Sequence, residues 1–302
     1  MANGQRPVIG FMGLGAIGRP MAERLVAGGA DVVVYNRTPE RTKIFEGRAR
    51  IATSPAELAG MVDIAFSCLT TRQSYEDVIL GPQGMIQGGR AKVYVHTGTN
   101  DVTLMTDIAN AVKAKGIETV DAPVTGGVSG AIAGKLTVMA AGDKTAFEQA
   151  EPFISHYAAK IVYLGATVGS GQFAKLVNNV LSAANLAIAS EAIVMGHKAG
   201  LDLVALLDVL NNGSGQNSAT SSKIPKQVLT RAFAHGAALD VMLKDIDAFL
   251  KEASGLGVPA PLGEAVRQSY VQAIKEDGGS ADVTAVIRPM ERAAGVEMPK
   301  VL

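Results

Sequence analysis

Lys175 and Asn179 are the side chains best suited to acid–base chemistry in this sequence. They lie in GSGQFAKLVNN, residues 169–179, and stand four apart, so a helix would present both on one face. A lysine in such apolar surroundings, kept away from water, has its pKa lowered and becomes a usable proton donor or acceptor. Asn179, one turn further on, can orient a hydroxyl or a carbonyl. Taken alone, Lys175 also fits a surface lysine whose stem snorkels along the helix.

A second candidate site is the glycine-rich segment DAPVTGGVSGA, residues 121–131, which follows an expected strand. Thr125, with the backbone amides of Gly126 and Gly127, forms a plausible nest for a carboxylate. The alternative is a sharp glycine-rich connection that binds no ligand.

Residues 8–37, VIGFMGLGAIGRPMAERLVAGGADVVVYNR, form a third and more specific pattern. An apolar run leads into G-x-G-x-x-G, and a helical pattern and a second apolar run follow. Gly13 permits a tight turn, Gly15 lets the backbone approach a pyrophosphate, and Gly18 lets helix and strand pack closely. The first helical N–H groups then face the anion. We therefore expect a dinucleotide at Gly13, Leu14, Gly15, Ala16, Ile17 and Gly18.

The residues after the second apolar run indicate which dinucleotide. An acid there would bind the ribose 2′-hydroxyl of NAD, but this chain has Asn36, Arg37 and Thr38. Arg37 can pair with a 2′-phosphate, Thr38 can add a hydroxyl donor, and Arg41 and Lys43 can raise the local potential. Arg37 could instead be an ordinary solvated charge. The missing carboxylate leads us to expect NADP(H) in preference to NAD(H).

The elements that must position these residues change in character along the chain. Up to about residue 165, short apolar runs alternate with helical stretches, which predicts a mostly parallel, doubly wound sheet with helices on both faces. The expected strands are 7–12, 31–36, 63–68, 92–96, 118–121, 135–141 and 161–164. The expected helices of this part lie near 16–28, 38–46, 55–59, 72–79, 101–115 and 144–155.

After residue 165 the pattern predicts helices only. The first runs from about 170 to 198, with no proline inside it, and is unusually long for a globular domain. Its most apolar stretch, 180–195, contains polar residues and is interpreted as a buried helix rather than a membrane span. Later helices are expected at 202–211, 217–230, 237–255, 260–276 and 283–292. The sequence thus predicts an α/β Rossmann domain, 1–165, and an all-helical domain for substrate binding and oligomerisation, 166–302, joined by the long helix.

Composition narrows the class of protein. The 302 residues, 48% of them hydrophobic, can bury a sizeable core, and 28 basic residues balance 28 acidic ones. We therefore expect neither a nucleic-acid nor a membrane partner. The single Cys68 and an N-terminus without signal-peptide architecture lead us to expect a cytoplasmic protein. The four histidines show no ligand spacing, so no metal is expected.

Four motifs give the chain a resemblance to the β-hydroxyacid dehydrogenase family. GLGAIGRPMA resembles its cofactor loop, DAPVTGGVSGAIAGKLTVMAAG its substrate-carboxylate segment, GSGQFAKLVNN its catalytic helix, and KDIDAFLKEASGLGVPAPL its late helix. These motifs occur in the family's order between residue 8 and about residue 260. The family includes 3-hydroxyisobutyrate dehydrogenase, tartronate semialdehyde reductase and the glyoxylate/succinic semialdehyde reductases.

The resemblance implies a role for each matching residue. Lys175 would be the catalytic acid/base and Asn179 its substrate-orienting partner. Thr125, where the family usually has serine, would hold the substrate carboxylate together with Gly126 and Gly127. In the late helix Lys244 would reach cofactor or substrate, and Asp245 would fix that helix. The residues that would line the cofactor elsewhere are Leu69, Thr70 and Thr99.

Two departures from the family pattern stand out. His96 and Gly98 lie in a run, HTGT, where the family usually has Asp-x-Ser-Thr beside the nicotinamide ribose. Ala237 stands where a phenylalanine commonly walls the substrate pocket, so this pocket would be wider unless Phe233 or Met242 refills it.

The resulting expectation is an NADP(H)-dependent oxidoreductase that interconverts a small β-hydroxyacid and its semialdehyde. Its expected partners are a small carboxylate-bearing substrate and further copies of itself, in a homodimer or a homotetramer. The alternatives are an imine reductase-like or a 6-phosphogluconate-type enzyme of the same fold, and a non-catalytic NADP-binding protein.

Overall fold

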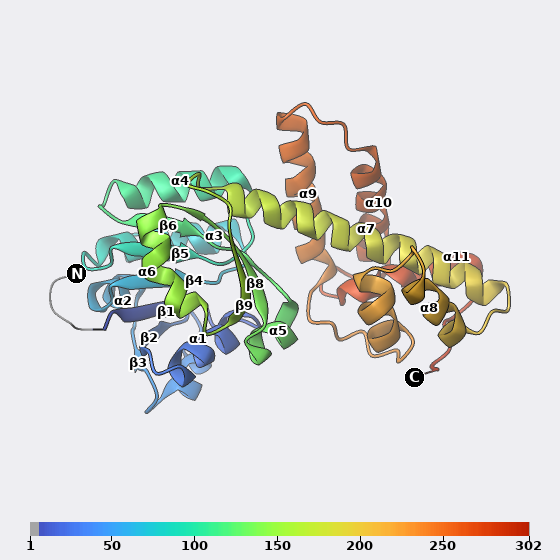
Figure 1. The fold of residues 1–302 in the computed structure, drawn as a ribbon, viewed down its shortest axis with the longest axis horizontal. Coiled ribbons are helices and arrows are strands. Elements are labelled where there is room, and N and C mark those ends of the chain that lie inside the picture. The colour runs from blue at the N-terminus through green and yellow to red at the C-terminus, as the bar shows by residue number, and fades with distance from the viewer. Residues whose placement is uncertain (1–5, 302) are drawn as a thin grey trace. The chain divides into compact units, whose positions relative to one another are not determined.

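The chain divides into two compact units, one ending at Lys175 and the other beginning at Leu176 (Figure 1). The computed structural model describes residues 6–301. The start of the long helix α7 (Ser170–Lys198) is bonded to the sheet of the first unit, so the division between the units falls inside this helix. The bounds of α7 match the expected 170–198.

A nine-stranded sheet forms the centre of the first unit, in the order β3-β2-β1-β4-β5-β6-β8-β7, with β9 beside β8. The first six strands in this order, from β3 through β2, β1, β4 and β5 to β6, run parallel to one another. Strand β8 is antiparallel to β6 and β7, and β9 is parallel to β8. The mostly parallel fold class is therefore confirmed. The strands are β1 (Val8–Met12), β2 (Asp31–Tyr35), β3 (Arg50–Ile51), β4 (Ile64–Ser67), β5 (Val93–His96), β6 (Glu118–Asp121), β7 (Val124–Thr125), β8 (Leu136–Gly142) and β9 (Ala158–Tyr163).

Alternating side chains give the sheet a hydrophobic core on each face. Val32 and Val34 of β2 pack with α1, α5 and α6, whereas Val33 between them packs with α2, α3 and α4. The helices are α1 (Gly18–Ala27), α2 (Pro55–Met61), α3 (Arg72–Tyr75), α4 (Val102–Lys113), α5 (Gly127–Ala133) and α6 (Lys144–Ile154). Three short helical segments are η1 (Pro39–Phe45), η2 (Glu76–Leu80) and η3 (Met85–Gln87).

Helices make up the second unit, as expected. They are the rest of α7, α8 (Leu203–Asn212), η4 (Ala219–Val228), α9 (Leu239–Gly255), α10 (Pro261–Asp277), η5 (Val283–Ile287) and α11 (Arg288–Ala294). By length and composition alone α7 could span a membrane, and within residues 6–301 it is the one helix of which this is true. However, Ala183, Leu186 and Ile193 of α7 lie in the core of this unit, which fits the interpretation of a buried helix.

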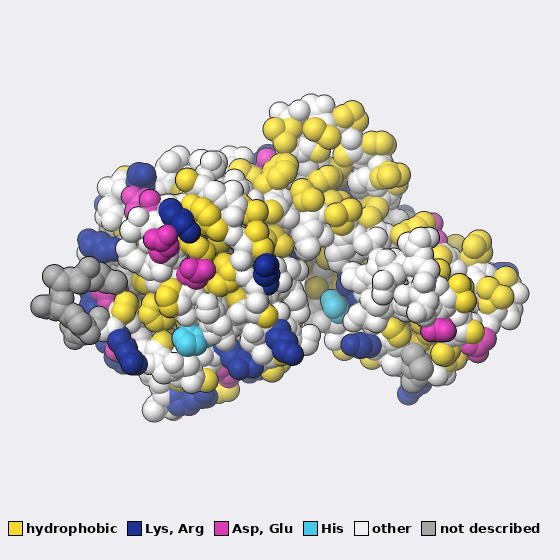
Figure 2. Space-filling model, in the orientation of Figure 1, with side chains coloured by type: hydrophobic (Ala, Val, Ile, Leu, Met, Phe, Trp, Pro, Cys, Tyr) yellow, Lys and Arg dark blue, Asp and Glu magenta, His cyan; other side chains and the backbone are white. Residues whose placement is uncertain are grey.

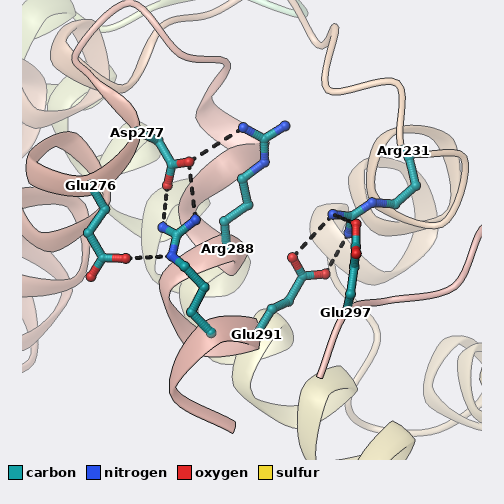
Figure 3. A network of polar contacts seen from close by, with 7 residues as sticks. Arg231, Glu276, Asp277, Arg288, Glu291 and Glu297 are labelled. Carbon is teal, nitrogen blue, oxygen red and sulfur yellow. Dashed lines mark hydrogen bonds and ion pairs between the residues drawn. The ribbon is translucent and has the colours of Figure 1, made fainter. Parts of the chain in front are cut away.

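Ion pairs tie the last helices of this unit together (Figure 3). The buried Glu291 accepts from Arg231 at 2.5 Å and from the backbone N–H of Met298 at 2.9 Å. Arg292 of α11 contacts Glu276 and Asp277 at the end of α10, each at 2.6 Å. The end of α10, α11 and the chain beyond it are therefore held as one cluster.

Candidate functional site

The glycine loop between β1 and α1 has the geometry of a phosphate cradle. A Cβ at residue 18 would lie 2.0 Å from the carbonyl oxygen of Gly13, so only glycine lets the helix approach the turn this closely. At Gly15 a Cβ would meet nothing within 4 Å, so the backbone there is open. Ile17, at the N-cap of α1, makes no side-chain cap bond, and the N–H of Arg19 donates to the carbonyl of Gly15 at 3.0 Å, so no side chain caps the helix start at which an anion could bind.

Asn36 connects the glycine loop to the loop after β2. Its Oδ1 accepts from the backbone N–H of Leu14 at 2.9 Å, and its Nδ2 donates to the carbonyl of Thr38 at 2.9 Å. Arg37 is exposed and pairs with no acid among residues 6–301. The Thr38 side chain makes no capping bond to η1, although Thr38 precedes that turn. Arg37 and the Thr38 hydroxyl are thus free to meet an anionic ligand.

A surface hollow of about 480 Å³ adjoins this loop. It is lined by Leu14, Gly15, Ala16, Arg19, Glu40, Arg41 and Ile44. Arg41 was expected near the cofactor, but Arg19 and Glu40 were missed, although Arg19 directly follows Gly18 in the motif. An open glycine backbone, an uncapped helix start and two arginines fit the pyrophosphate of a dinucleotide.

Tyr75 accounts for the departures at His96 and Gly98. Its Oη contacts both the N–H and the carbonyl of Leu69, at 3.0 and 3.2 Å. Its ring stacks on His96, with centroids 4.3 Å apart. A Cβ at residue 98 would lie 2.0 Å from that hydroxyl, so Gly98 makes room for it. Tyr75 thereby fixes the loop of Leu69 and Thr70. This loop follows β4, and Tyr75 joins it to the end of β5 at His96.

His96 is fully buried and structural. Its Nδ1 lies 3.1 Å from Tyr94 Oη, and that hydroxyl lies 2.7 Å from Ser67 Oγ. Asn100 Nδ2 contacts His96 Nε2 at 3.0 Å, so a neutral ring carries its proton on Nδ1. The histidine therefore holds the loop that bears Thr99 instead of facing a ligand.

Asp121, at the end of β6, anchors the start of α7. Its Oδ2 accepts from the backbone N–H of Gly169 and of Gln172, each at 3.0 Å, and its Oδ1 accepts from Gln172 Nε2 at 2.7 Å. Burial raises the pKa of Asp121 to about 6, against the opposing effect of these donors. Gln172 also accepts from the N–H of Asn100 at 2.8 Å. The chain after β5 and the first turns of α7 are thus one hydrogen-bonded assembly.

Lys175 lies on those first turns of α7 and is buried, with 8% of its surface exposed. The segment expected to hold a carboxylate lies at the start of α5. Gly126 and Gly127 are exposed and both have positive φ, +126° and +67°, and Thr125 is half-buried. The two glycines therefore form a turn that a residue with a side chain would adopt only under strain.

Asn179 and the late helix α9 meet within the second unit. Asn179 Nδ2 donates to Asp245 Oδ2 at 2.7 Å, and the Lys244 ammonium lies 3.0 Å from Asp245 Oδ1. Asp245 is buried and contacts both side chains, so it links α7 to α9. The structure thus brings together residues of two motifs that lie far apart in the sequence, 169–179 and 244–262.

Ala237 is half-buried, and its carbonyl accepts from the N–H of Val283 at 2.8 Å. Phe233 is not free to refill the space beside it. The guanidinium groups of Arg231 and Arg288 both lie over its ring, 4.8 and 4.2 Å from the centroid. Met242 packs against the helical core.

Two negative findings bear on the chemistry. Among residues 6–301 no group of three His, Cys, Asp or Glu side chains could hold a metal ion. Burial raises the pKa of the Cys68 thiol to about 11, so it stays protonated and is a poor nucleophile.

Comparison with known proteins identifies the family. Residues 8–165 match the model of the NAD binding domain of 6-phosphogluconate dehydrogenase, and residues 169–290 match that of the NAD-binding region of NADP-dependent 3-hydroxyisobutyrate dehydrogenase. The 2-(hydroxymethyl)glutarate dehydrogenase of Eubacterium barkeri is 32% identical over 292 residues, 96% of this chain and 97% of that protein. The chloroplastic glyoxylate/succinic semialdehyde reductase 2 of Arabidopsis thaliana is 33% identical, over 96% of this chain and 81% of that protein.

A solved structure gives the same result. The 3-hydroxyisobutyrate dehydrogenase of Mycobacterium tuberculosis, solved with L-serine, is 28% identical and has a TM-score of 0.83, covering 95% of this chain and 99% of that one. The chain belongs to the β-hydroxyacid dehydrogenase family and is an NAD(P)-dependent oxidoreductase that acts on CH–OH groups.

Proposed function

We propose that this protein is an NADP(H)-dependent enzyme that interconverts a small β-hydroxyacid and its semialdehyde, with Lys175 as the general acid/base. The observation that carries this proposal is the buried Lys175 on a helix start that Asp121 anchors. The names of the relatives, a hydroxymethylglutarate dehydrogenase and a semialdehyde reductase, support the substrate class. The lysine–asparagine pair on α7 speaks against a non-catalytic protein and against an imine reductase-like enzyme.

In the reducing direction, Lys175 donates a proton to the oxygen that develops negative charge. Asn179 donates one N–H to Asp245 and accepts from Asn178, and within residues 6–301 its second N–H and second lone pair remain for that oxygen while Asp245 holds the amide. The amides of Gly126 and Gly127, with Thr125, bind the carboxylate. When bound, the cofactor supplies the hydride, and orientation is the protein's contribution.

Most of the residues proposed to hold the cofactor belong to the first unit. The glycine loop would take the pyrophosphate, with Asn36 fixing its position, and Arg37 and Thr38 would take the 2′-phosphate. Leu69, Thr70, Thr99 and Lys244 would line the remainder. The function itself is tested by steady-state assays of β-hydroxyacids and semialdehydes with NADP(H) and NAD(H). We expect turnover of at least one such pair, with NADP(H) more efficient, and no turnover with any pair would refute the proposal.

Changing Arg37 to aspartate should shift cofactor preference toward NAD(H). The substitution removes a charge-assisted contact worth about 1.5–3 kcal/mol and adds an acceptor for ribose hydroxyls. The ratio of kcat/KM for NADPH to that for NADH should therefore fall about 10- to 100-fold. Arg48→Asp, an exposed arginine of the same segment, is the control and should leave the ratio unchanged. Equal efficiency of the unaltered enzyme with both cofactors would contradict the role of Arg37.

The exposed face of α7 leads us to propose a dimer or a tetramer. Leu181, Ile188 and Met195, spaced seven apart, are 59%, 59% and 71% exposed, and Figure 2 shows hydrophobic side chains gathered over this helix. Such a stripe is more apolar surface than a monomer usually leaves bare. Light scattering or sedimentation at micromolar concentration should give an oligomer, and Ile188→Glu should weaken it. A monomeric mass for the unaltered protein would exclude this assembly.

In keeping with one unpaired cysteine, we place the protein in the cytoplasm.

A further inference from the structure

Lys223 is a buried lysine that the proposed mechanism does not use. It lies on η4 and is 8% exposed, and its Nζ donates to Ser182 Oγ of α7 at 2.6 Å. Within residues 6–301 no carboxylate pairs with it, and burial lowers its pKa. A buried cation held by one hydroxyl is costly, because nothing of opposite charge offsets its lost hydration.

The groups around Lys223 do not supply the missing negative charge. His235 is half-buried, and both burial and the charge of Lys223 lower its pKa. An imidazole is either neutral or cationic, so it supplies no negative charge. Asp282 acts on the same histidine, but its two oxygens accept from the backbone N–H groups of Gly236 and Thr284, at 2.9 and 3.0 Å. Both oxygens of Asp282 are thus bonded to Gly236 and Thr284, and within the described residues Asp282 forms no ion pair with Lys223.

The helix that carries Lys223 is itself unusual. The ten residues Ala219–Val228 form a wide, π-type helix, and an i→i+5 bond joins the N–H of Leu229 to the carbonyl of Ile224 at 3.0 Å. Such helices are rare and occur often at functional sites. The unfavourable helix geometry and the buried ammonium group of Lys223, which has no ion-pair partner among the described residues, thus occur in the same segment.

Ser182 relates Lys223 to the acid–base residues. Lys175, Asn179 and Ser182 follow each other on α7 at spacings of four and three, so they share one face. With a rise of about 1.5 Å per residue, Ser182 lies about 4.5 Å along the axis beyond Asn179. The ammonium of Lys223 therefore lies about one helical turn past the residue proposed to orient the reacting oxygen.

We infer that Lys223 binds a second, distal carboxylate of the substrate, so that the preferred substrate is a β-hydroxyacid whose side chain ends in a carboxylate. This inference rests on the proposed function. Three or four C–C bonds of about 1.5 Å each span the distance from the reacting carbon to such a group. Ala237, two residues from His235, has a short side chain, and the ring of Phe233 is held by Arg231 and Arg288.

The test compares 2-(hydroxymethyl)glutarate with its 5-carboxamide, a neutral tail of the same size. The unaltered enzyme should use the dicarboxylate at least about tenfold more efficiently, since one charge-assisted bond is at stake. Lys223→Met should lower kcat/KM for the dicarboxylate about 10- to 100-fold, mainly through KM, and leave the carboxamide nearly unchanged. Lys226→Met, an exposed lysine on the same helix, is the matched control and should change neither.

The possible outcomes separate this inference from the proposed function. Equal efficiency of the unaltered enzyme with the two substrates overturns the role of Lys223 without any variant, as does a folded Lys223→Met enzyme that keeps the preference. Turnover of other β-hydroxyacids in either case leaves the proposed function standing. No turnover of any hydroxyacid or semialdehyde with either cofactor overturns both.

Discussion

Replacing Lys175 with alanine is expected to lower the turnover number by about two to four orders of magnitude, the range for a positioned acid/base. The side chain is buried, and it stands on the turns of α7 that Asp121 fixes, so no water can take its place with the same orientation. Steady-state rates with a semialdehyde and NADPH measure the loss. Cofactor affinity, followed by NADPH fluorescence, should change little, because the residues proposed to bind phosphate lie elsewhere.

A matched control for this experiment is Lys198→Ala, at the other end of the same helix. Lys198 is exposed and donates to the carbonyl of Ala294 at 2.7 Å, so its loss should leave turnover intact. Near-normal turnover in a correctly folded Lys175→Ala enzyme would remove Lys175 from the mechanism.

Changing Asp121 to asparagine should destabilise the protein by about 1–3 kcal/mol and lower turnover as well. Each carboxylate oxygen of Asp121 accepts from N–H groups, whereas an asparagine would turn an NH₂ group toward one of these donors. The Gln172 amide cannot flip to compensate, because its oxygen accepts from Asn100 N–H and its nitrogen donates to the carbonyl of Gly98 at 3.1 Å. One buried donor remains unsatisfied in every arrangement, and the start of the helix that carries Lys175 shifts.

Urea unfolding of the variant measures this loss, and Asp143→Asn is its control. Asp143 caps α6 by accepting from the N–H of Ala146 at 2.7 Å, and asparagine caps a helix equally well, so stability should change little there. An Asp121→Asn protein as stable and as active as the unaltered one would show that the assembly around Asp121 does not position Lys175.

The pH dependence of stability gives a second measurement on Asp121. Its pKa is raised from 3.8 to about 6 in the folded protein, so the folded state keeps this proton where the unfolded state has lost it. The contribution of Asp121 to stability therefore falls as the pH rises between these two values and is constant above them. The Asp121→Asn variant should lack this component of the slope.

The sequence predicted the fold where local patterns are strong. The alternating apolar runs predicted the main strands of the Rossmann sheet, and the unbroken apolar pattern predicted the bounds of α7. It missed β3 and β7, which have two residues each, because such short strands have no pattern of their own. It also missed α5, since the glycines of residues 126–134 argue against a helix.

The sequence predicted only those residues of the candidate site that lie together in one local motif. The glycine loop was found because its spacing is set by contacts within one turn. The contacts of Tyr75 with His96 and Gly98, and of Asp121 with Gln172, join segments far apart in the chain, and no local pattern indicates them. Lys223 was missed for the same reason, because its burial results from the packing of η4 against α7.

Transfer of deuterium from NADPH labelled at the nicotinamide C4 position tests the proposed reaction most directly. The enzyme should be incubated with this cofactor and a semialdehyde that it reduces, and the product should be examined by NMR and mass spectrometry. We expect one deuterium per molecule on the carbinol carbon of a β-hydroxyacid, formed far more slowly by Lys175→Ala. Oxidation of the cofactor without deuterium at that carbon, or no reaction with any semialdehyde, would contradict the assignment of this chain as a β-hydroxyacid dehydrogenase.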